Sequence, residues 1–371
     1  MIVASRLSAS VPVTGIDVSA YRIPTATAEE SDGTATWNAT TLVLVEAEAG
    51  GKHGLGYTYA DTATATMIKD QLAAIVCGHD AMAIGEIWAA LVSEIRNMGR
   101  PGISAMAISA VDNALWDLKA KLFETSLLTL LGAQRAQTPV YGSGGFTSYS
   151  IRELQEHMAH WVEMGIPRVK MKIGRDPTAD IERIEAVRNA IGAPAELFVD
   201  ANGAYSRKQA LAQAERFAQH RVTWFEEPVY HRDLEGLRLM RDRAPAEMEI
   251  SAGEYGYDPM YFEQMLAAQA VDVLQADVTR AEGITGFLVA DGLCEARMIP
   301  LSTHCAPSMS LHPACAAKRI RHIEYFYDHA RIEHMLFDGA PTPVDGMLEP
   351  DLSRPGIGLE FKHADARPYR V

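Results

Sequence analysis

From about residue 138 onward, the hydrophobic pattern alternates between short apolar runs and amphipathic segments with helical spacing. Apolar runs of this length, bounded by loops and separated by helices, are typical of buried strands in a parallel sheet. Eight runs are predicted to be strands: 138–142, 168–172, 196–200, 222–226, 248–252, 272–276, 297–302 and 320–324. Because seven helical patterns lie between them, the sequence predicts an α/β barrel of the TIM type.

The first 132 residues follow a different pattern. Residues 41–48 alternate like a strand, and the Gly50-Gly51 pair ends it. Helical spacing follows at 65–76, 84–97 and 104–122, the last behind the Pro101-Gly102 break. These elements predict an N-terminal α+β domain over 1–132, ahead of a barrel domain over 133–330.

After residue 324 the helical signal fades, and prolines and glycines become frequent. This composition predicts a loop-rich C-terminal tail, residues 331–371. We expect the tail to return to the N-terminal domain and complete it.

Composition and charge narrow the class of protein. A chain of 371 residues, 48% of them hydrophobic, can form one large core with a smaller attached domain. Thirty-four basic residues against 48 acidic ones give a net charge of −14, which argues against nucleic acid or an anionic membrane as a partner. We expect a small-molecule enzyme.

The remaining composition predicts a cytoplasmic protein. The four cysteines show no CxxC spacing and are expected to be reduced. The first fifteen residues lack the unbroken apolar run of an export signal, and no stretch is long enough to span a bilayer.

Acidic residues recur at the ends of three successive predicted strands. Asp200 ends LFVD, Glu226 follows it by 26 residues in WFEEP, and Glu254 follows by a further 28 in EISAGE. A parallel barrel brings the carboxyl ends of its strands together at one mouth. Three converging carboxylates repel one another unless a cation lies between them, and oxygen ligands favour Mg²⁺ or Mn²⁺.

Two lysines and an aspartate–histidine pair lie at the ends of other predicted strands. Lys170 and Lys172 lie on one face of the second strand because side chains alternate along a strand. Such a pair taken alone is more often found on a solvated strand, but this strand belongs to the barrel whose next three strands carry the acids, which reverses the preference. Asp277 ends the sixth strand and His304 the seventh, so the carboxylate can orient the imidazole as a general base requires.

The ordered set of motifs resembles the mandelate racemase subgroup of the enolase superfamily, over nearly the whole chain. The motifs are Lys170-Met171-Lys172, Asp200-Ala201-Asn202-Gly203, Glu226-Glu227-Pro228, Gly253-Glu254, Asp277 and His304, with the capping-domain segment AISAVDNALWDLKAK. The resemblance implies an α+β capping domain on a (β/α)7β modified TIM barrel. It also implies a homo-oligomer, either a dimer or an octamer.

The resemblance implies that Asp200, Glu226 and Glu254 bind one Mg²⁺, with Mn²⁺ as a possible substitute. In this family the metal binds the substrate carboxylate and stabilises the enediolate formed when the α-proton leaves. Lys172 is implied as the base on one face, and Lys170 as a group beside the substrate carboxylate that depresses the pKa of Lys172.

The resemblance also implies roles for residues around the substrate. The Asp277/His304 pair would serve the opposite face, either as a base or as the acid for a leaving hydroxyl. Glu324 matches a position that hydrogen-bonds the substrate carboxylate, with a surface acid as the alternative. Ser143 is expected to donate to the same carboxylate, with a plain turn serine as the alternative, and Asn202 to support the metal site. Glu227 should point away from the metal because it alternates with Glu226, and it is therefore expected to be structural.

Two positions depart from the expected pattern: Glu282 stands where many relatives have glycine, and Arg280 where mandelate racemase has lysine. We expect neither to touch a metal ligand. The segment 21–60 is expected to form a lid over the substrate. Its hydroxyl-bearing and aromatic residues suit a polyhydroxy chain: Tyr21, Thr25, Thr27, Trp37, His53, Tyr57 and Tyr59.

The hypothesis from sequence is therefore an acid-sugar dehydratase, which removes the α-proton and then the β-hydroxyl of a small carboxylate substrate. A racemase or epimerase that uses Lys172 and His304 on opposite faces of one carbon is the alternative. A non-catalytic barrel is disfavoured because every acid and base of the motif set is present.

Overall fold

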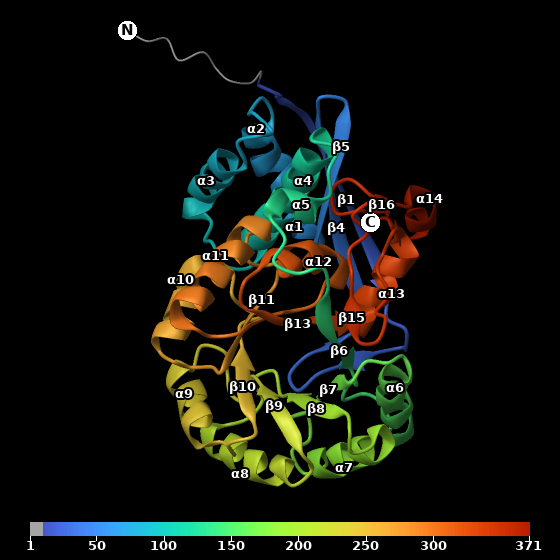
Figure 1. Ribbon diagram of the computed structural model, residues 1–371, viewed down its shortest axis with the longest axis vertical. Coiled ribbons are helices and arrows are strands. Elements are labelled where there is room, and N and C mark those ends of the chain that lie inside the picture. The colour runs from blue at the N-terminus through green and yellow to red at the C-terminus, as the bar shows by residue number, and fades with distance from the viewer. Residues whose placement is uncertain (1–9) are drawn as a thin grey trace.

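Eight parallel strands close into a barrel in the computed structural model, which describes residues 10–371 (Figure 1). The strands pair in sequence order, and the last pairs with the first to close the barrel. They are β6 (Thr138–Gly144), β7 (Arg168–Lys172), β8 (Glu196–Asp200), β9 (Val222–Glu226), β10 (Glu249–Ala252), β11 (Val273–Ala276), β12 (Leu301–Thr303) and β13 (Ile320–Phe326). The predicted barrel is confirmed.

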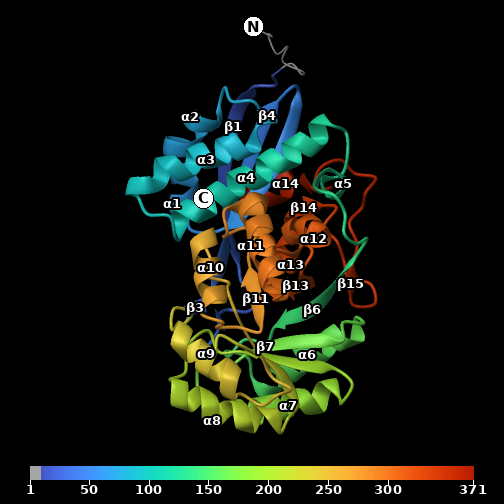
Figure 2. The same ribbon diagram turned by 60° about the vertical axis from the view of Figure 1, so that its left-hand side comes forward.

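Helices surround the barrel on its outside (Figures 1 and 2). They are α6 (Ile151–Glu163), α7 (Asp180–Ile191), α8 (Arg207–Ala218), α9 (Leu234–Arg243), α10 (Pro259–Ala267), α11 (Gly283–Arg297), α12 (Pro307–Ala316) and α13 (Tyr327–Leu336). The local sequence fixes where several of these helices begin. Ser150 and Glu153 form a reciprocal capping box at the N-terminus of α6, and Asp258 caps α10 ahead of Pro259.

Two predictions about elements of the barrel domain were wrong. The strand expected at 297–302 begins only at Leu301, because α11 continues to Arg297 and ends at Met298 in a left-handed conformation (φ 56°). The helical signal was expected to fade after 324, yet α13 follows β13 directly. Its buried face includes Asp328 and Glu333, and buried acids hide the apolar stripe by which an amphipathic helix is recognised.

The N-terminal domain packs a three-stranded antiparallel sheet against a long helix (Figure 2). The sheet contains β1 (Val13–Pro24), β4 (Ala39–Ala49) and β5 (Lys52–Tyr59), while β2 (Glu30–Ser31) and β3 (Thr36–Trp37) form a small hairpin. The helices are α1 (Thr62–Met67), α2 (Ala73–Val76), α3 (Ile84–Glu94), α4 (Ile103–Leu122) and α5 (Leu127–Leu131). A π-helical turn at 68–72 interrupts the predicted helix 65–76, and a 3₁₀ turn at 95–97 ends the predicted helix 84–97.

The C-terminal tail contacts both domains. It contains β14 (Phe337–Asp338), β15 (Met347–Leu348), β16 (Glu360–Phe361) and α14 (His363–Ala366). Strand β15 pairs with β6 of the barrel, whereas the Val371 amide donates to the Ala20 carbonyl in β1 at 3.0 Å. The tail therefore completes the capping domain, as expected. The exact domain boundaries stay a prediction, and the one at residue 330 falls inside α13.

No helix within residues 10–371 is both long and apolar enough to cross a bilayer. The expectation about an export signal rests partly on residues 1–9, which lie outside the described residues.

The close approach of β5 to α4 depends on Gly54 and Gly56. A methyl group built on Gly56 would overlap the Ala110 carbonyl and the Ala114 amide of α4, and both are rigid backbone. We predict that Gly56→Ala lowers the free energy of unfolding by about 1–3 kcal/mol, the usual cost of overpacking.

Gly85, on the exposed side of α3, is the matched control because a methyl group there has nothing within 4 Å. Gly85→Ala should stabilise the helix by roughly 0.5–1 kcal/mol. Urea unfolding of both variants measures the difference, and equal effects would contradict the packing argument.

Candidate active site at the mouth of the barrel

The carboxyl ends of seven barrel strands carry buried charged or titratable groups that converge on one cavity. Parallel strands place these ends at the same side of a barrel. The groups are Lys170 and Lys172 on β7, Asp200 on β8, Glu226 on β9, Glu254 after β10, Asp277 after β11, His304 after β12 and Glu324 on β13, and none exposes more than 6% of its surface.

Asp200, Glu226 and Glu254 each place a carboxylate oxygen within 4.8 Å of the other two. Burial raises the pKa of Glu226 far above its usual range, because the ionised form loses its hydration. Glu254 Oε2 is buried and has no hydrogen-bond partner among the described residues. Three buried oxygen donors, one of them unpaired, fit a hard divalent cation such as Mg²⁺.

The two lysines lie against these acids. Lys170 Nζ is 2.5 Å from Glu226 Oε1 and 2.8 Å from Glu324 Oε1, and Lys172 hydrogen-bonds Asp200. Burial by itself lowers the pKa of Lys172, but the charges of Asp200, Glu254 and Glu226 together outweigh burial, so the pKa is raised. The expectation of a depressed pKa was wrong for this arrangement. Lys170 does lower the pKa of Lys172, as expected, but its effect is smaller than that of Asp200.

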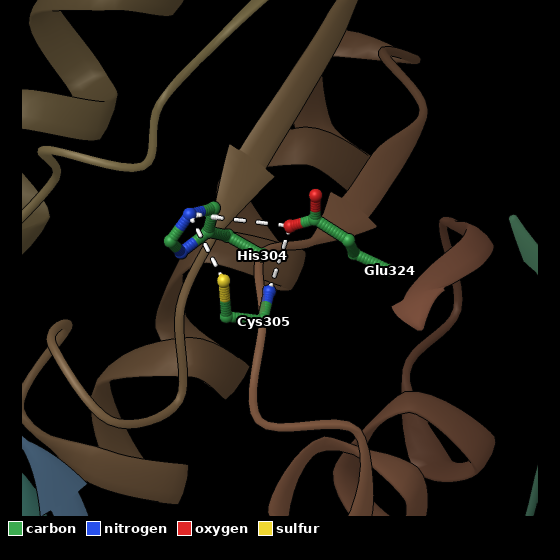
Figure 3. Close-up of side chains that lie close together, drawn as sticks. All are labelled: His304, Cys305 and Glu324. Atoms are coloured by element: carbon green, nitrogen blue, oxygen red, sulfur yellow. Dashed lines mark hydrogen bonds and ion pairs between the residues drawn. The ribbon is translucent and has the colours of Figure 1, made fainter. Parts of the chain in front are cut away.

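His304 is held by Asp277. Its Nδ1 lies 2.7 Å from Asp277 Oδ2, while the other Asp277 oxygen accepts from the Thr279 amide and hydroxyl. Burial alone would raise the pKa of Asp277, but the hydrogen bond and charge of His304 lower it. With Nδ1 engaged, His304 Nε2 faces Cys305 and Glu324 (Figure 3). Glu254 Oε2 lies 3.4 Å from the same nitrogen.

Glu324 is a buried member of the cluster, so the surface-acid alternative was wrong. One of its oxygens pairs with Lys170, and the other accepts the Cys305 amide at 2.9 Å. Burial raises its pKa, but Lys170, His304 and Lys172 together outweigh burial, so the pKa is lowered. Ser143 is also buried, in strand β6 beside Lys170, and its hydroxyl has no partner among residues 10–371; it is not a turn serine.

Asn202 and Glu227 follow two of the ligand strands. The Asn202 amide donates to Asp200 Oδ1 at 2.8 Å, and its side chain lines the cavity. Glu227 is buried, and burial together with the charge of Glu254 raises its pKa strongly.

The departure at Arg280 does touch the acidic cluster, contrary to expectation. Its guanidinium lies 3.5 Å from Glu254 Oε1 and 3.6 Å from Asp277 Oδ2, and it lines the cavity. Glu282 behaves as expected and forms an ion pair with Arg100 of the N-terminal domain. Its φ of 62° lies in the left-handed region, where glycine is the usual residue.

The cavity above these groups has a volume of about 410 Å³ and is closed partly by the N-terminal domain. Of the seven predicted lid residues, Trp37 and Tyr59 line it. Tyr59 stacks on His329 at 3.5 Å between ring centroids, and burial lowers the pKa of His329 to about 3. His329 is therefore a neutral wall of the cavity.

The other predicted lid residues lie elsewhere. Tyr57 donates to Glu333 at 2.7 Å, Tyr21 packs on Phe361 of the tail, and His53 is exposed on the β4–β5 hairpin. The sequence reasoning missed the polar residues that do line the cavity: Asp32, Thr40, Thr41, Asp61 and Cys305. Asp32, Thr40, Thr41 and Asp61 reach the cavity through the docking of the N-terminal domain on the barrel, and Cys305 through the turn after β12; strand periodicity encodes neither.

Comparison with known proteins agrees with this geometry. Residues 14–132 match the N-terminal domain model of mandelate racemase/muconate lactonizing enzyme, and residues 153–366 match the enolase C-terminal domain-like model. A 3,6-anhydro-alpha-L-galactonate cycloisomerase of Streptomyces coelicolor is 31% identical over 329 residues, which cover 86% of this chain and 90% of the relative.

Two solved structures extend the comparison. A mandelate racemase/muconate lactonizing enzyme-like protein of Rubrobacter xylanophilus is 52% identical, with a TM-score of 0.95 over 97% of this chain and 100% of the other. L-Talarate dehydratase of Polaromonas sp. JS666, complexed with Mg and L-glucarate, is 30% identical, with a TM-score of 0.87 over 98% of each chain.

The capping domain, the modified TIM barrel and the acids at its mouth define a member of the enolase superfamily. Within it, the chain belongs to the mandelate racemase/muconate lactonizing enzyme family.

The contact between the β2–β3 hairpin, residues 30–37, and helix α13 is expected to depend on pH. Glu30 is fully buried beside Asp328 of α13, and burial together with the Asp328 charge raises its pKa to about 8. Below its ordinary pKa, Glu30 is neutral whether the hairpin is open or closed. Between about pH 4.5 and 8, only the closed form holds the proton, so closure weakens as pH rises.

We predict that backbone protection of residues 30–37 falls by up to about tenfold per pH unit in this window and levels off above about pH 8. Hydrogen exchange, corrected for the intrinsic rate, measures the fall. Glu30→Gln removes the ionisation and should give a nearly flat profile. Identical profiles for the two proteins would exclude Glu30 as the source.

Proposed function

We propose that this chain is a Mg²⁺-dependent enzyme that abstracts the proton α to a carboxylate and then eliminates the β-hydroxyl of an acid sugar. The observation that carries the proposal is the placement of Lys172 and the Asp277-oriented His304 on separate strands around one cavity with the three carboxylates. The dehydratase of known structure, complexed with Mg and L-glucarate, supports the choice of substrate class.

Asp200, Glu226 and Glu254 would hold the metal, and the backbone amide of Asn202 would orient the Asp200 carboxylate. A divalent cation supplies positive charge opposite the substrate carboxylate as its α-proton leaves. The buried, unpaired Glu254 Oε2 is the feature of this chain that most directly calls for such a cation.

Lys172 would take the α-proton. Lys172 can act as a base only as the neutral amine. Because the charge of Asp200 favours the protonated form, that charge must be neutralised by another cation, such as the metal that Asp200 would bind. Lys170 favours the neutral amine by repulsion and is fixed between Glu226 and Glu324. Lys170 and Ser143 would then position the substrate carboxylate beside that base, and Glu324 would hydrogen-bond it only in its protonated form.

His304 would donate a proton from Nε2 to the departing β-hydroxyl. The hydrogen bond from Nδ1 to Asp277 stabilises the imidazolium that must exist before this step. In the overall change Lys172 gains one proton, His304 gives one to the leaving water, and the remaining enol tautomerises to a 2-keto-3-deoxy acid.

An isomerase that uses the same groups is the second candidate, and the cycloisomerase relative from Streptomyces coelicolor favours it. In a racemase or epimerase, Lys172 and His304 would exchange protons on opposite faces of one carbon and nothing would leave. The polar cavity wall suits either reaction, since Thr40, Thr41 and Asp61 can bind hydroxyl groups.

Proton NMR in D₂O distinguishes these functions. We expect the Mg²⁺-loaded protein, incubated with pooled mono- and diacid sugars, to consume one substrate and produce new 3-deoxy methylene signals. Exchange of the α-proton without a new formula would favour the racemase or epimerase, and a cyclised isomer would favour the cycloisomerase. No exchange with any acid sugar would contradict the proposed substrate class.

The two catalytic groups can be separated by substitution. Lys172→Ala and His304→Asn should each lower turnover by about 10²–10⁴-fold, the usual contribution of a general acid or base. Mg²⁺ affinity should change little. Lys52→Ala, at an exposed ion pair, serves as the control. Turnover that survives either change removes that residue from the mechanism, and α-proton exchange that survives in one variant shows that its missing group is not the base.

The metal assignment has its own test. Glu226→Gln removes a buried charge and should weaken Mg²⁺ binding by more than about tenfold in calorimetry. Glu249→Gln, the same change at the opposite end of the barrel, is the matched control, because Glu249 pairs only with Arg321 among the described residues. Equal Mg²⁺ affinities in the two variants would refute the ligand set. Activity should also disappear with EDTA and return with Mg²⁺.

A further inference from the structure

A cysteine lies directly against the reactive nitrogen of His304. Cys305 takes a left-handed backbone conformation (φ 49°), and its Sγ is 3.3 Å from His304 Nε2 (Figure 3). The side chain lines the cavity and is 4% exposed. The thiol is thus buried, yet it borders open space.

Two carboxylate oxygens lie near the same nitrogen. Glu324 Oε2 lies 3.9 Å from His304 Nε2, and Glu254 Oε2 lies 3.4 Å from it. Lys170 occupies the other oxygen of Glu324, while Oε2 accepts the Cys305 backbone amide at 2.9 Å and keeps a second lone pair for a further contact. Glu254 Oε2 has no hydrogen-bond partner among residues 10–371.

One nitrogen, one sulfur and one oxygen, from His304, Cys305 and Glu324, are ligands typical of zinc, whose fourth position is free for water. Tetrahedral Zn²⁺ with bonds of about 2.0–2.3 Å separates neighbouring ligand atoms by roughly 3.3–3.7 Å. The distances from His304 Nε2 to Cys305 Sγ and to Glu324 Oε2 are close to this range without movement of the backbone. Sulfur favours Zn²⁺ strongly over Mg²⁺, whereas the set of Asp200, Glu226 and Glu254 contains oxygen alone.

We propose that His304, Cys305 and Glu324, whose ligand atoms lie within 4.8 Å of one another, form a second metal site that is selective for Zn²⁺ and adjoins the all-oxygen site. Binding there releases the Cys305 thiol proton to solvent and occupies the lone pair of His304 Nε2. If the proposed function holds, Zn²⁺ is an inhibitor that blocks His304 while Mg²⁺ remains bound.

Cobalt makes the site visible without any substrate. Co²⁺ replaces Zn²⁺ at such sites, and a thiolate ligand adds a sulfur-to-cobalt charge-transfer band in the near ultraviolet. We expect the Mg²⁺-saturated protein to develop this band with one equivalent of Co²⁺ and to lose it when Zn²⁺ is added. Absence of the band in the unmodified protein overturns the proposal, whatever the variants do.

Cysteine variants locate the band. Cys305→Ser should abolish it, whereas Cys77→Ser, at the exposed cysteine, should leave it unchanged. A band that survives Cys305→Ser and disappears in Cys77→Ser would show adventitious surface binding and overturn the proposal. Glu324→Gln provides a second variant, in which the apparent Co²⁺ affinity should fall by more than about tenfold.

The inhibition is measured separately. In excess Mg²⁺, the Zn²⁺ concentration that halves α-proton exchange should rise by at least about tenfold in Cys305→Ser relative to Cys77→Ser. An unchanged Zn²⁺ sensitivity, alongside a cobalt band that depends on Cys305, would retain the metal site and reject its inhibitory role. Failure of α-proton exchange in the unmodified protein would count against the proposed function and not against the site.

Discussion

The structure depends on a buried cluster of opposite charges at the barrel mouth. Isolated charges cannot be buried at an acceptable free energy, and even paired ones lose several kcal/mol of hydration each. Lys170 offsets this cost by contacting Glu226 and Glu324 at once, from a strand that neighbours neither of theirs in the barrel. The cluster therefore requires the barrel to close with these strands at one fixed register, and the closed barrel in turn keeps the acids from spreading into solvent.

The N-terminal domain meets this rigid centre through a short hairpin. Arg175, after β7, donates to the Asp32 carbonyl at 3.1 Å and to the Thr36 hydroxyl at 2.8 Å, and the Ser31 hydroxyl lies 2.7 Å from that of Thr147. These bonds tie residues 31–36 to the barrel. The barrel thus supplies the acids and bases. The β2–β3 hairpin forms one wall of the cavity, and its residues can differ, and so select a substrate, without changing the buried charges of the barrel.

The sequence predicted most of the barrel because strand ends obey simple rules. A period of two places Lys170 and Lys172 on one face, and parallel pairing brings Asp200, Glu226 and Glu254 together. Positions that depend on long side chains or unusual backbone did not follow from such rules. Arg280 reaches Glu254 from a turn after β11. The sequence did not predict helix α13, because its buried face carries Asp328 and Glu333.

Several residues that shape the mouth share a backbone feature that hydrophobic patterns cannot reveal. Asn202, Glu227, Cys305 and Ala306 have φ values between 38° and 49°, although none is glycine. This left-handed region costs an ordinary residue roughly 1–2 kcal/mol, so it persists only where the surrounding fold enforces it.

Each of these residues lies just after a barrel strand, where the chain must turn sharply away from the mouth. The turn leaves the last strand residue, such as Asp200 or Glu226, facing the centre, while the next residues return to the outer helices. At Cys305 the same turn brings a thiol against His304 and a backbone amide against Glu324. A left-handed turn of the same kind thus follows Asp200 and Glu226 of the all-oxygen site and His304 of the proposed second site, so both sites depend on how sharply the chain leaves a barrel strand.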